Sequence, residues 1–520
     1  MRYPDSPLHS RVHFFHYHDG RLHCEDVDLA RVAREFGTPL YVYSAGTVLD
    51  HYRRLDAALG PLDHLICYAV KANSNRAILR LLADEDPGFD IVSGGELYRV
   101  LAAGGDPKKC TFAGVGKSRE EIEYALGEGV YSFNVESEAE LDYINEIAGE
   151  KGARAPIALR VNPDIDPHTH EYISTGLHEN KFGIALDQVG AIYERAAKMG
   201  NIDIVGVQMH IGSQITEAKP FADAIKKVAP LVRELKSKYG IKFFSIGGGM
   251  GIIYRRALES GSGKWWHDHG GEPSAFSIRD YANAVVSPLS GLGVRILIEP
   301  GRFLVGNAGV LLTRVRYIKS ASGEIRRGER TGQKKFAIVD AGMNDLIRPA
   351  LYQSYHEIVP VKEPGTPSPS SSPSGRGGCD ATGEGGIEGV ATEEADSFPT
   401  GMGTRFRQTP EKAGGTCSVP SAKKKDDTEV VPPSYLTREK IDIVGPVCES
   451  GDFFALDREM PDVGEGDLLA IMSAGAYGFV MASNYNSRPL PAEVLVRGDK
   501  FALIRKRQTW QDLVRDEVEL

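Results

Sequence analysis

The chain has 520 residues, 41% of them hydrophobic, so it can bury a sizeable core and is expected to form about two or more domains. Its 61 Lys and Arg residues against 71 Asp and Glu residues give a net charge of -10, which argues against binding to a nucleic-acid backbone. No run approaches the roughly 18 apolar residues of a membrane span, and six scattered cysteines without a CxxC pair or an apolar signal segment indicate a reduced, cytoplasmic protein, with an organelle left open.

The first 35 residues are expected to pack on a second domain, and residues 36–308 alternate apolar strand-like runs with helical segments. Eight such runs occur, at residues 64–70, 89–93, 110–114, 131–135, 157–161, 204–212, 243–249 and 294–299. Because strands buried on both faces read as continuous apolar runs, their number and spacing predict a (β/α)8 barrel of the TIM type. An open doubly wound sheet is the alternative.

After residue 308 the pattern changes to alternating strand-like runs with turn signals between them. Residues 309–520 are therefore predicted to form a second, mainly β domain. Residues 364–433 interrupt it with a stretch rich in Pro, Ser and Gly and poor in aromatic residues. Such a segment cannot bury enough apolar surface to offset its ordering entropy, which predicts a disordered insertion in a surface loop.

Polar and glycine residues follow the predicted strands, at the end of a barrel where its enzymes carry their chemistry. They include Lys71, Asp90, Ser93, Asn162, His210, Ser213, the glycines 247–249 and residues 299–302. A lysine at a strand end usually extends into solvent. At an apolar barrel end, however, lost hydration would lower the pKa of Lys71 and make its amine a Schiff-base nucleophile for an aldehyde cofactor.

Two glycine-rich stretches raise the question of phosphate binding. The GGGMG stretch at 247–251 follows the seventh strand, where bare backbone N–H groups can approach an anion, although a plain tight turn would look the same. It lacks the GxGxxG spacing of a dinucleotide site. The TFAGVGKS stretch at 111–118 has Thr111 where the Walker pattern needs glycine, so a nucleotide-binding loop is disfavoured.

The EPGR stretch places Glu299 and Arg302 at the end of the last strand. A structural ion pair is the ordinary interpretation. Alternatively, Glu299 could keep a heteroaromatic nitrogen protonated, and Arg302 could hold a phosphate or carboxylate. His210 would ordinarily be a core histidine, or it could stack on a planar cofactor. Histidine pairs at 16–18, 168–170 and 267–269 lack supporting ligands at metal-site spacing, so no metal is expected.

The predicted β domain carries further polar groups. Cys448 and Glu449 follow an apolar strand, where a buried, inert cysteine is the ordinary interpretation. Arg348 and Tyr352 in RPALY could clamp a carboxylate, and Tyr477 in AGAYG is a phenolic donor.

Jointly, these motifs resemble the diaminopimelate decarboxylase family, in the alanine-racemase-like (fold type III) class of pyridoxal-phosphate enzymes. The resemblance extends from GTPLYVYS at 37–44 through YAVKAN, FDIVSGGEL, KFGI, HIGSQI, GGGMGI, EPGR, DAGMNDLIRPALY and GPVCESGD to AGAYG, and omits the predicted insertion. YAVKAN and HIGS alone would also fit ornithine and arginine decarboxylases.

The resemblance implies decarboxylation of meso-2,6-diaminopimelate to L-lysine with pyridoxal 5'-phosphate as cofactor. It implies that Lys71 carries the cofactor as a Schiff base, that His210 lies against its ring and that Glu299 pairs with its pyridine nitrogen. The residues implied to surround its phosphate are Ser213, Gly247, Gly248, Gly249, Arg302 and Tyr477, and Pro300 and Gly301 are further implied cofactor-binding residues. The implied substrate-binding residues are Arg302, Arg348, Tyr352, Glu449 and Tyr477. Cys448 would return a proton to the α-carbon, and Cys448 and Glu449 would reach the neighbouring subunit's barrel in a homodimer.

Three alternatives stay open from the sequence. One is a decarboxylase of ornithine or arginine, although a distal amino-acid head group suits Glu449 with Arg348 and Tyr352 better than a lone ammonium does. Another is a non-catalytic homologue that acts as a binding protein, which would be expected to have lost Lys71 or Cys448. The third is a nucleotide-dependent enzyme that uses TFAGVGKS.

Overall fold

The computed structural model describes residues 12–166, 181–269, 276–322, 333–364 and 438–520. The expected insertion at 364–433 therefore lies outside the described residues from residue 365 onward, as does the histidine pair at 168–170. None of the described helices is both long enough and apolar enough to cross a membrane.

Eight parallel strands close into a barrel, which confirms the predicted fold class. They are β5 (His64–Ala69), β6 (Gly88–Ile91), β7 (Cys110–Phe112), β8 (Ser132–Val135), β9 (Ala155–Asn162), β11 (Ile202–Met209), β12 (Phe243–Ser245) and β13 (Arg295–Ile298). Each strand pairs with the next, β13 pairs with β5, and β8 pairs with β9. This closure excludes the open doubly wound sheet. The short β10 (Ile184–Ala185) adds to β9 outside the closed ring.

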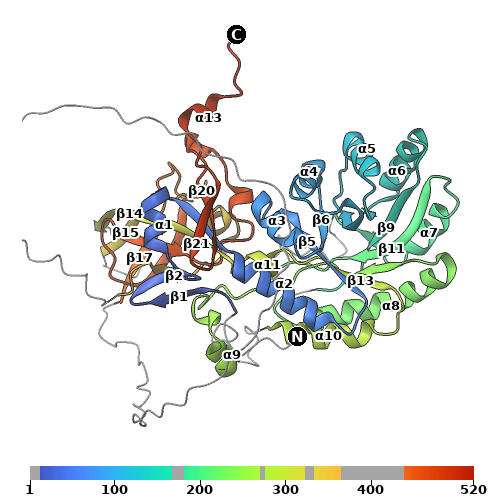
Figure 1. Ribbon diagram of the computed structural model, residues 1–520, viewed down its shortest axis with the longest axis horizontal. Coiled ribbons are helices and arrows are strands. Elements are labelled where there is room, and N and C mark those ends of the chain that lie inside the picture. The colour runs from blue at the N-terminus through green and yellow to red at the C-terminus, as the bar shows by residue number, and fades with distance from the viewer. Residues whose placement is uncertain (1–11, 167–180, 270–275, 323–332, 365–437) are drawn as a thin grey trace, which may run out of the picture. The chain divides into compact units, whose positions relative to one another are not determined.

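Helices cover the outside of the barrel strands (Figure 1). They are α2 (Ala45–Leu59), α3 (Arg76–Ala83), α4 (Gly94–Ala102), α5 (Arg119–Glu128), α6 (Glu138–Glu150), α7 (Val189–Ala196), α8 (Lys219–Tyr239) and α10 (Ile278–Leu289). The short α11 (Arg302–Val305) follows β13 and packs beside α2, and the short α9 (Gly263–His269) lies apart from the barrel strands in Figure 1. Several begin where a polar side chain caps the first turn, as Ser93 does for α4 and Ser137 for α6. Ser93 and Ser137 follow shortly after β6 and β8, so the same capping residue marks the end of a strand region and the start of the next helix.

The barrel interior is filled with side chains. Cys67, Phe243 and Leu297 form a buried apolar cluster within it. Gly206 makes room for this packing, because a Cβ atom there would lie 2.5 Å from the Phe243 ring. The polar end of the barrel is therefore the part left for chemistry.

The second domain is a mainly β structure, as predicted. Its strands are β4 (Leu40–Ser44), β14 (Gly309–Ser322), β15 (Gln333–Val339), β16 (Ile358–Pro360), β17 (Arg438–Val444), β18 (Phe453–Pro461), β19 (Leu468–Ile471), β20 (Ala492–Arg497) and β21 (Lys500–Arg505). The main sheet has the order β18-β17-β15-β14-β4-β20-β21. Two short helices, α12 (Arg348–Tyr352) and α13 (Trp510–Val514), accompany these strands.

The segment before the barrel contributes to the second domain. The hairpin strands β1 (Phe15–His18), β2 (Arg21–Cys24) and β3 (Val27–Asp28) and helix α1 (Leu29–Phe36) share an apolar cluster with β4, β14 and β20. Strand β4 lies between β14 and β20 and is not a barrel strand. The first barrel-covering element is therefore α2, which begins at Ala45, later than the expected boundary at residue 36.

Candidate active site

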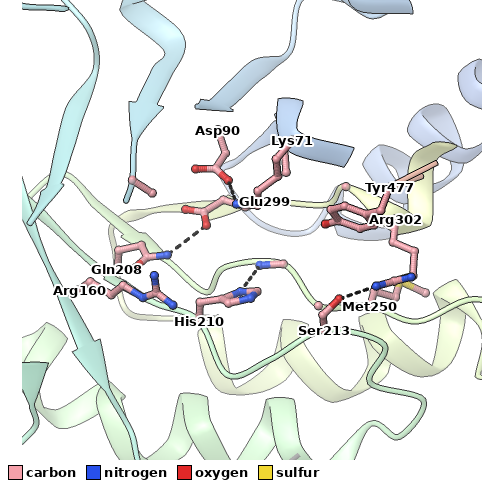
Figure 2. Close-up of a pocket in the computed structure, with 15 residues that line it drawn as sticks. Lys71, Asp90, Arg160, Gln208, His210, Ser213, Met250, Glu299, Arg302 and Tyr477 are labelled. Atoms are coloured by element: carbon pink, nitrogen blue, oxygen red, sulfur yellow. Dashed lines mark hydrogen bonds and ion pairs between the residues drawn. The ribbon is translucent and has the colours of Figure 1, made fainter. Parts of the chain in front are cut away.

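Lys71 projects from the first barrel strand toward a pocket at the strand ends. A single 3-10 turn (Val70–Ala72) follows β5 and is held in place because the Tyr477 N–H donates to the Ala72 carbonyl at 2.8 Å. The Lys71 ammonium then forms an ion pair with Asp90 on β6, with Nζ and Oδ2 2.8 Å apart (Figure 2). Asp90 is buried, whereas 41% of the Lys71 side chain remains exposed because it faces the open pocket.

The pKa of Lys71 differs from the sequence-based expectation. Burial alone would lower it, as expected, but the carboxylate of Asp90 outweighs burial and raises the pKa of Lys71 above its ordinary value. The amine is therefore held as an ammonium in this structure. Lost hydration at the strand end acts in the expected direction, but the neighbouring strand β6 supplies a carboxylate whose effect is larger.

Glu299 occupies a buried position at the end of β13. Its two oxygens accept hydrogen bonds from Ser245 Oγ at 2.6 Å and from Gln208 Nε2 at 3.1 Å. Burial, together with the nearby charge of Asp90, raises the pKa of Glu299 to about 7. Glu299 is thus a carboxyl group poised between its two protonation states near neutral pH, and it has no ion-pair partner among the residues the structure describes.

This pKa gives the ligand-free protein a pH-dependent stability. Because the folded-state value of about 7 lies above the ordinary 4.5, the free energy of unfolding falls as pH rises through that window. A shift of this size corresponds to roughly 3 kcal/mol at most. Between about pH 5 and pH 8, we expect the free energy of unfolding of wild type to fall by about 1–3 kcal/mol more than that of Glu299→Gln. Urea unfolding at a series of pH values measures this difference. Parallel pH profiles would contradict the assignment.

His210 follows β11 and lies beside the glycine-rich turn. The Gly248 N–H donates to its Nδ1 atom at 3.2 Å. Burial and the positive charges of Arg160 and Lys71 lower the pKa of His210 well below its usual value, so the ring is neutral. A neutral, flat imidazole at this place can pack against another planar ring.

The glycines at 247–249 are required by the close approach of two backbones. Gly247 and Gly249 have φ angles of +72° and +105°, in the left-handed region that favours glycine. A Cβ atom on Gly248 would collide with the backbone carbonyl of Glu299. The turn therefore presents bare backbone to the pocket.

Replacing Gly248 with alanine is expected to destabilise the fold. Because the obstructing atom belongs to the backbone, either the turn or the end of β13 must move, which costs about 1–3 kcal/mol of unfolding free energy. Gly116→Ala is the matched control, since nothing lies within 4 Å of a Cβ atom at Gly116. Thermal unfolding should separate the two variants, and equal melting temperatures would contradict the expectation.

Arg302 and Arg348 form a buried pair of guanidinium groups. Arg302 donates to Tyr254 Oη at 2.5 Å and to Ser213 Oγ at 3.0 Å. Both guanidinium groups lie within 6 Å of the Tyr254 and Tyr477 rings. Neither arginine pairs with a carboxylate among the described residues, and the Nε atom of each has no hydrogen-bond partner there. Such an arrangement is suited to binding an anion.

Most of the expected site residues converge on this pocket. The lining includes Lys71, His210, Ser213, Gly248, Gly249, Glu299, Gly301, Arg302 and Tyr477. Gly247 and Pro300 are their chain neighbours. Arg348 contacts the pocket residue Tyr477 and lies 5.7 Å from the Tyr352 ring.

Cys448 and Glu449 lie elsewhere. Both are exposed, and neither lines the pocket. The Cys448 N–H donates to Asn486 Oδ1 at 2.9 Å, and Glu449 accepts from the Tyr485 hydroxyl at 3.0 Å. Cys448 is not the buried, inert cysteine of the ordinary interpretation, because its thiol is on the surface.

Three residues of the site were not identified from the sequence, namely Arg160, Gln208 and Tyr254. Asp90 was expected at this end of the barrel but was given no role. Arg160 donates from Nη1 to both oxygens of Glu136, at 3.2 and 3.1 Å. The available signal was a charged or amide residue inside an otherwise apolar strand, as in the ALRVN and GVQMH stretches.

The sequence also raised two other possibilities, a nucleotide-binding loop and a metal site. In TFAGVGKS, Lys117 is buried and donates to Glu140, to the Gly114 carbonyl and to the Asn134 carbonyl, which assigns it to the packing of the barrel. No group of three or more His, Cys, Asp or Glu side chains among the described residues is placed to hold a metal ion.

Comparisons with known proteins identify what the chain resembles. Residues 45–306 match the family described as pyridoxal-dependent decarboxylase, pyridoxal binding domain, and residues 390–475 match the C-terminal sheet domain of pyridoxal-dependent decarboxylases. Diaminopimelate decarboxylase of Pseudomonas aeruginosa is 43% identical over 97% of this chain and 98% of its own length. The crystal structure of diaminopimelate decarboxylase from Helicobacter pylori complexed with L-lysine is 34% identical, covers 94% of this chain and 98% of its own, and has a TM-score of 0.72. Lysine/ornithine decarboxylase from Vibrio vulnificus, 19% identical over 90% of this chain and 97% of its own with a TM-score of 0.63, shares the fold.

Proposed function

The chain belongs to the pyridoxal-dependent decarboxylases, within the diaminopimelate decarboxylase family, and we propose that it converts meso-2,6-diaminopimelate to L-lysine and carbon dioxide with pyridoxal 5'-phosphate as cofactor. The observation that carries the proposal is the convergence of a lysine, a buried carboxyl group and an arginine beside bare glycine backbone in one pocket. Each is a group that this cofactor requires.

The residues present fit pyridoxal phosphate. Lys71 offers a primary amine to an aldehyde, and Glu299 faces the same pocket as a carboxyl group without an ion-pair partner among the described residues. Arg302 has a buried Nε atom that lacks a hydrogen-bond partner in the described part of the chain, and Gly248 and Gly249 present backbone where a phosphate could approach. We therefore assign Lys71 to holding the aldehyde, and Ser213, Arg302, Tyr477 and the glycine turn to the phosphate.

When bound, pyridoxal phosphate supplies an electron sink for the charge left on the α-carbon as carbon dioxide departs. Glu299 would hold the proton on the ring nitrogen, since a buried carboxyl group with a pKa near 7 can share a proton with that base. His210, neutral and buried, would pack against the ring. Asp90 would keep the Lys71 ammonium in place whenever the amine is released from the cofactor.

The substrate contacts are assigned to the arginine pair and to groups on the surface. Arg302, Arg348 and Tyr352 would grip the carboxylate that is retained, and Glu449 would pair with the distal ammonium. Cys448 would donate a proton to the α-carbon. Ornithine, which carries only an ammonium at its distal end, would leave a buried guanidinium without its carboxylate, which favours diaminopimelate.

We propose a homodimer that shares its active sites. Cys448 and Glu449 are exposed and lie outside the pocket of their own chain, yet the chemistry needs both a proton donor and an ammonium partner at that pocket. A second copy related by two-fold symmetry could supply them in each direction, because a two-fold interface is reciprocal.

Carbon dioxide release tests the proposed function directly. We expect purified protein with added pyridoxal phosphate to release carbon dioxide from meso-diaminopimelate, while ornithine and arginine at the same concentration give at least about 100-fold lower kcat/KM. If carbon dioxide were released only from ornithine or arginine, that amino acid and not meso-diaminopimelate would be the substrate. A protein that takes up the cofactor but decarboxylates none of the three would support the non-catalytic alternative.

A further inference from the structure

A second concave site lies between the barrel helices α3 and α4 and strand β21 of the second domain, and it shares no lining residue with the pocket that contains Lys71. It has a volume of about 480 Å³ and is formed by α3, α4 and β21. Its lining consists of Asn75, Arg76, Ala77, Arg80, Arg99, Ala102, Ala103, Ile504 and Arg505. We call these residues the arginine groove.

The arginine groove has four guanidinium groups and no carboxylate in its lining. Arg76 forms no ion pair or side-chain hydrogen bond with another residue of the described chain. Arg80 pairs only with Asp84 at 3.4 Å, and since 66% of each side chain is exposed, this pair is screened by water. Arg505 is paired with the buried carboxylate of Glu493, so within the described chain the unpaired positive charge of the groove comes from Arg76 and Arg99 together with the weakly paired Arg80. The chain as a whole carries a net charge of -10, so this positive charge is a local feature.

Arg76 lies at an electrostatically unfavourable position, the first turn of α3. The N-terminal turn of a helix carries a partial positive charge, which favours acidic side chains and disfavours cations. Helices α4, α5, α6 and α10 place Asp or Glu in their first turn, although α5 also begins with Arg119, and α8 has no acidic residue there and begins with Lys219. Helix α3 has no acidic residue there and begins with Arg76. Arg76 is therefore a cation that neither the helix dipole nor an acidic residue of the first turn offsets.

The floor of the groove is held in place by a buried carboxylate. Glu493 is fully buried and accepts hydrogen bonds from Arg505 Nε, from Asn75 Nδ2 at 2.8 Å and from the Tyr43 hydroxyl at 2.8 Å. Arg99 is fixed in turn, because its Nη1 donates to the Ser74 carbonyl at 3.2 Å. Both guanidinium groups keep donors that these contacts do not use. A binding surface that is ordered in advance loses less entropy when a ligand arrives.

From the cavity, its charge and its ordered floor, we propose that the arginine groove binds a small oxyanion with two or more negative charges, a phosphorylated compound or a polycarboxylate. Guanidinium groups suit both, since they match the oxygens of phosphate and carboxylate groups in bidentate fashion. The α3 N-terminus would add its backbone N–H groups and dipole to the same anion.

Calorimetric titration at low ionic strength tests the proposal. The protein is used with pyridoxal phosphate bound, so that the phosphate position of the active site is already filled. Inorganic phosphate, pyrophosphate and citrate are the probes. We expect at least one of them to bind wild type, and Arg76→Gln/Arg80→Gln to weaken that binding at least about 10-fold. Tighter binding of pyrophosphate would assign a phosphorylated ligand, and tighter binding of citrate would assign a polycarboxylate.

The matched control is Arg233→Gln/Arg279→Gln, which removes two exposed arginines from α8 and α10 of the same barrel. It should bind the probes as wild type does. Without probe, the single variant Arg76→Gln should melt at or above the wild-type temperature, because Arg76 is a cation in the first turn of α3, where the helix dipole is unfavourable to it. Equal probe affinity in the two double variants, no binding to wild type, or a lower melting temperature for Arg76→Gln without probe would overturn the proposal.

Discussion

Replacing Lys71 with alanine is expected to remove both the covalent hold on pyridoxal phosphate and the turnover of meso-diaminopimelate. Lys71 lines the pocket beside Glu299 and Arg302, and the described lining contains no second lysine that could take its place. We expect the visible absorbance of the bound cofactor to disappear and kcat to fall by roughly 10³-fold or more. Absorbance spectra and carbon dioxide release measured on the same preparation report the two effects separately.

A matched control uses Lys117, a buried lysine elsewhere in the barrel. Lys117 pairs with Glu140 at 2.5 Å and does not line the pocket. Lys117→Ala leaves Glu140 buried without its partner and should cost about 3–5 kcal/mol of stability while cofactor absorbance is kept at low temperature. Persistent absorbance and turnover in Lys71→Ala would contradict the assignment of Lys71. Loss of absorbance in a folded Lys117→Ala would contradict the prediction that cofactor binding depends on Lys71 and not on Lys117.

The fold could be predicted because its signals are local. Eight continuous apolar runs separated by helical segments are a property of the sequence alone, and all eight became barrel strands. The assignment of β4 could not be obtained in the same way. Its sequence reads as a buried strand, but its partners β14 and β20 lie hundreds of residues further along the chain. Local pattern therefore establishes that a strand exists and not which sheet it joins.

Some features of the site could likewise be predicted from the sequence, and others depend on contacts between elements. Lys71, Glu299 and Arg302 could be singled out because each stands at the end of an apolar strand, and position past a barrel strand carries meaning. The pKa of Lys71 could not be predicted, because it depends on a carboxylate that the pairing of β5 with β6 brings to 2.8 Å. Tyr254 belongs to the same class, since its contact with Arg302 joins residues 48 positions apart. Electrostatics of a site follow from packing between elements, which sequence spacing does not encode.

The proposed homodimer predicts that two inactive variants restore each other. Lys71→Ala and Cys448→Ala should each lack decarboxylase activity as separate proteins. In a mixed dimer, the Cys448→Ala chain provides an intact Lys71 and the Lys71→Ala chain provides an intact Cys448. If Cys448 acts across the interface, these two residues meet in one of the two sites. Random exchange should then restore about a quarter of wild-type activity, since half the dimers are mixed and each has one complete site.

The same experiment excludes the arrangement in which each chain uses its own Cys448. In that case every site of a mixed dimer contains either an altered lysine or an altered cysteine, and mixing restores nothing. Subunits would be exchanged by unfolding and refolding the two variants together, with wild type treated in parallel to correct for losses. A mixture of Lys71→Ala with Glu299→Gln, two changes in the same pocket, should stay inactive. Recovery in that control, or a lack of recovery with Cys448→Ala while wild type refolds, would contradict active sites shared between subunits, because only residues from different chains can complement in this way.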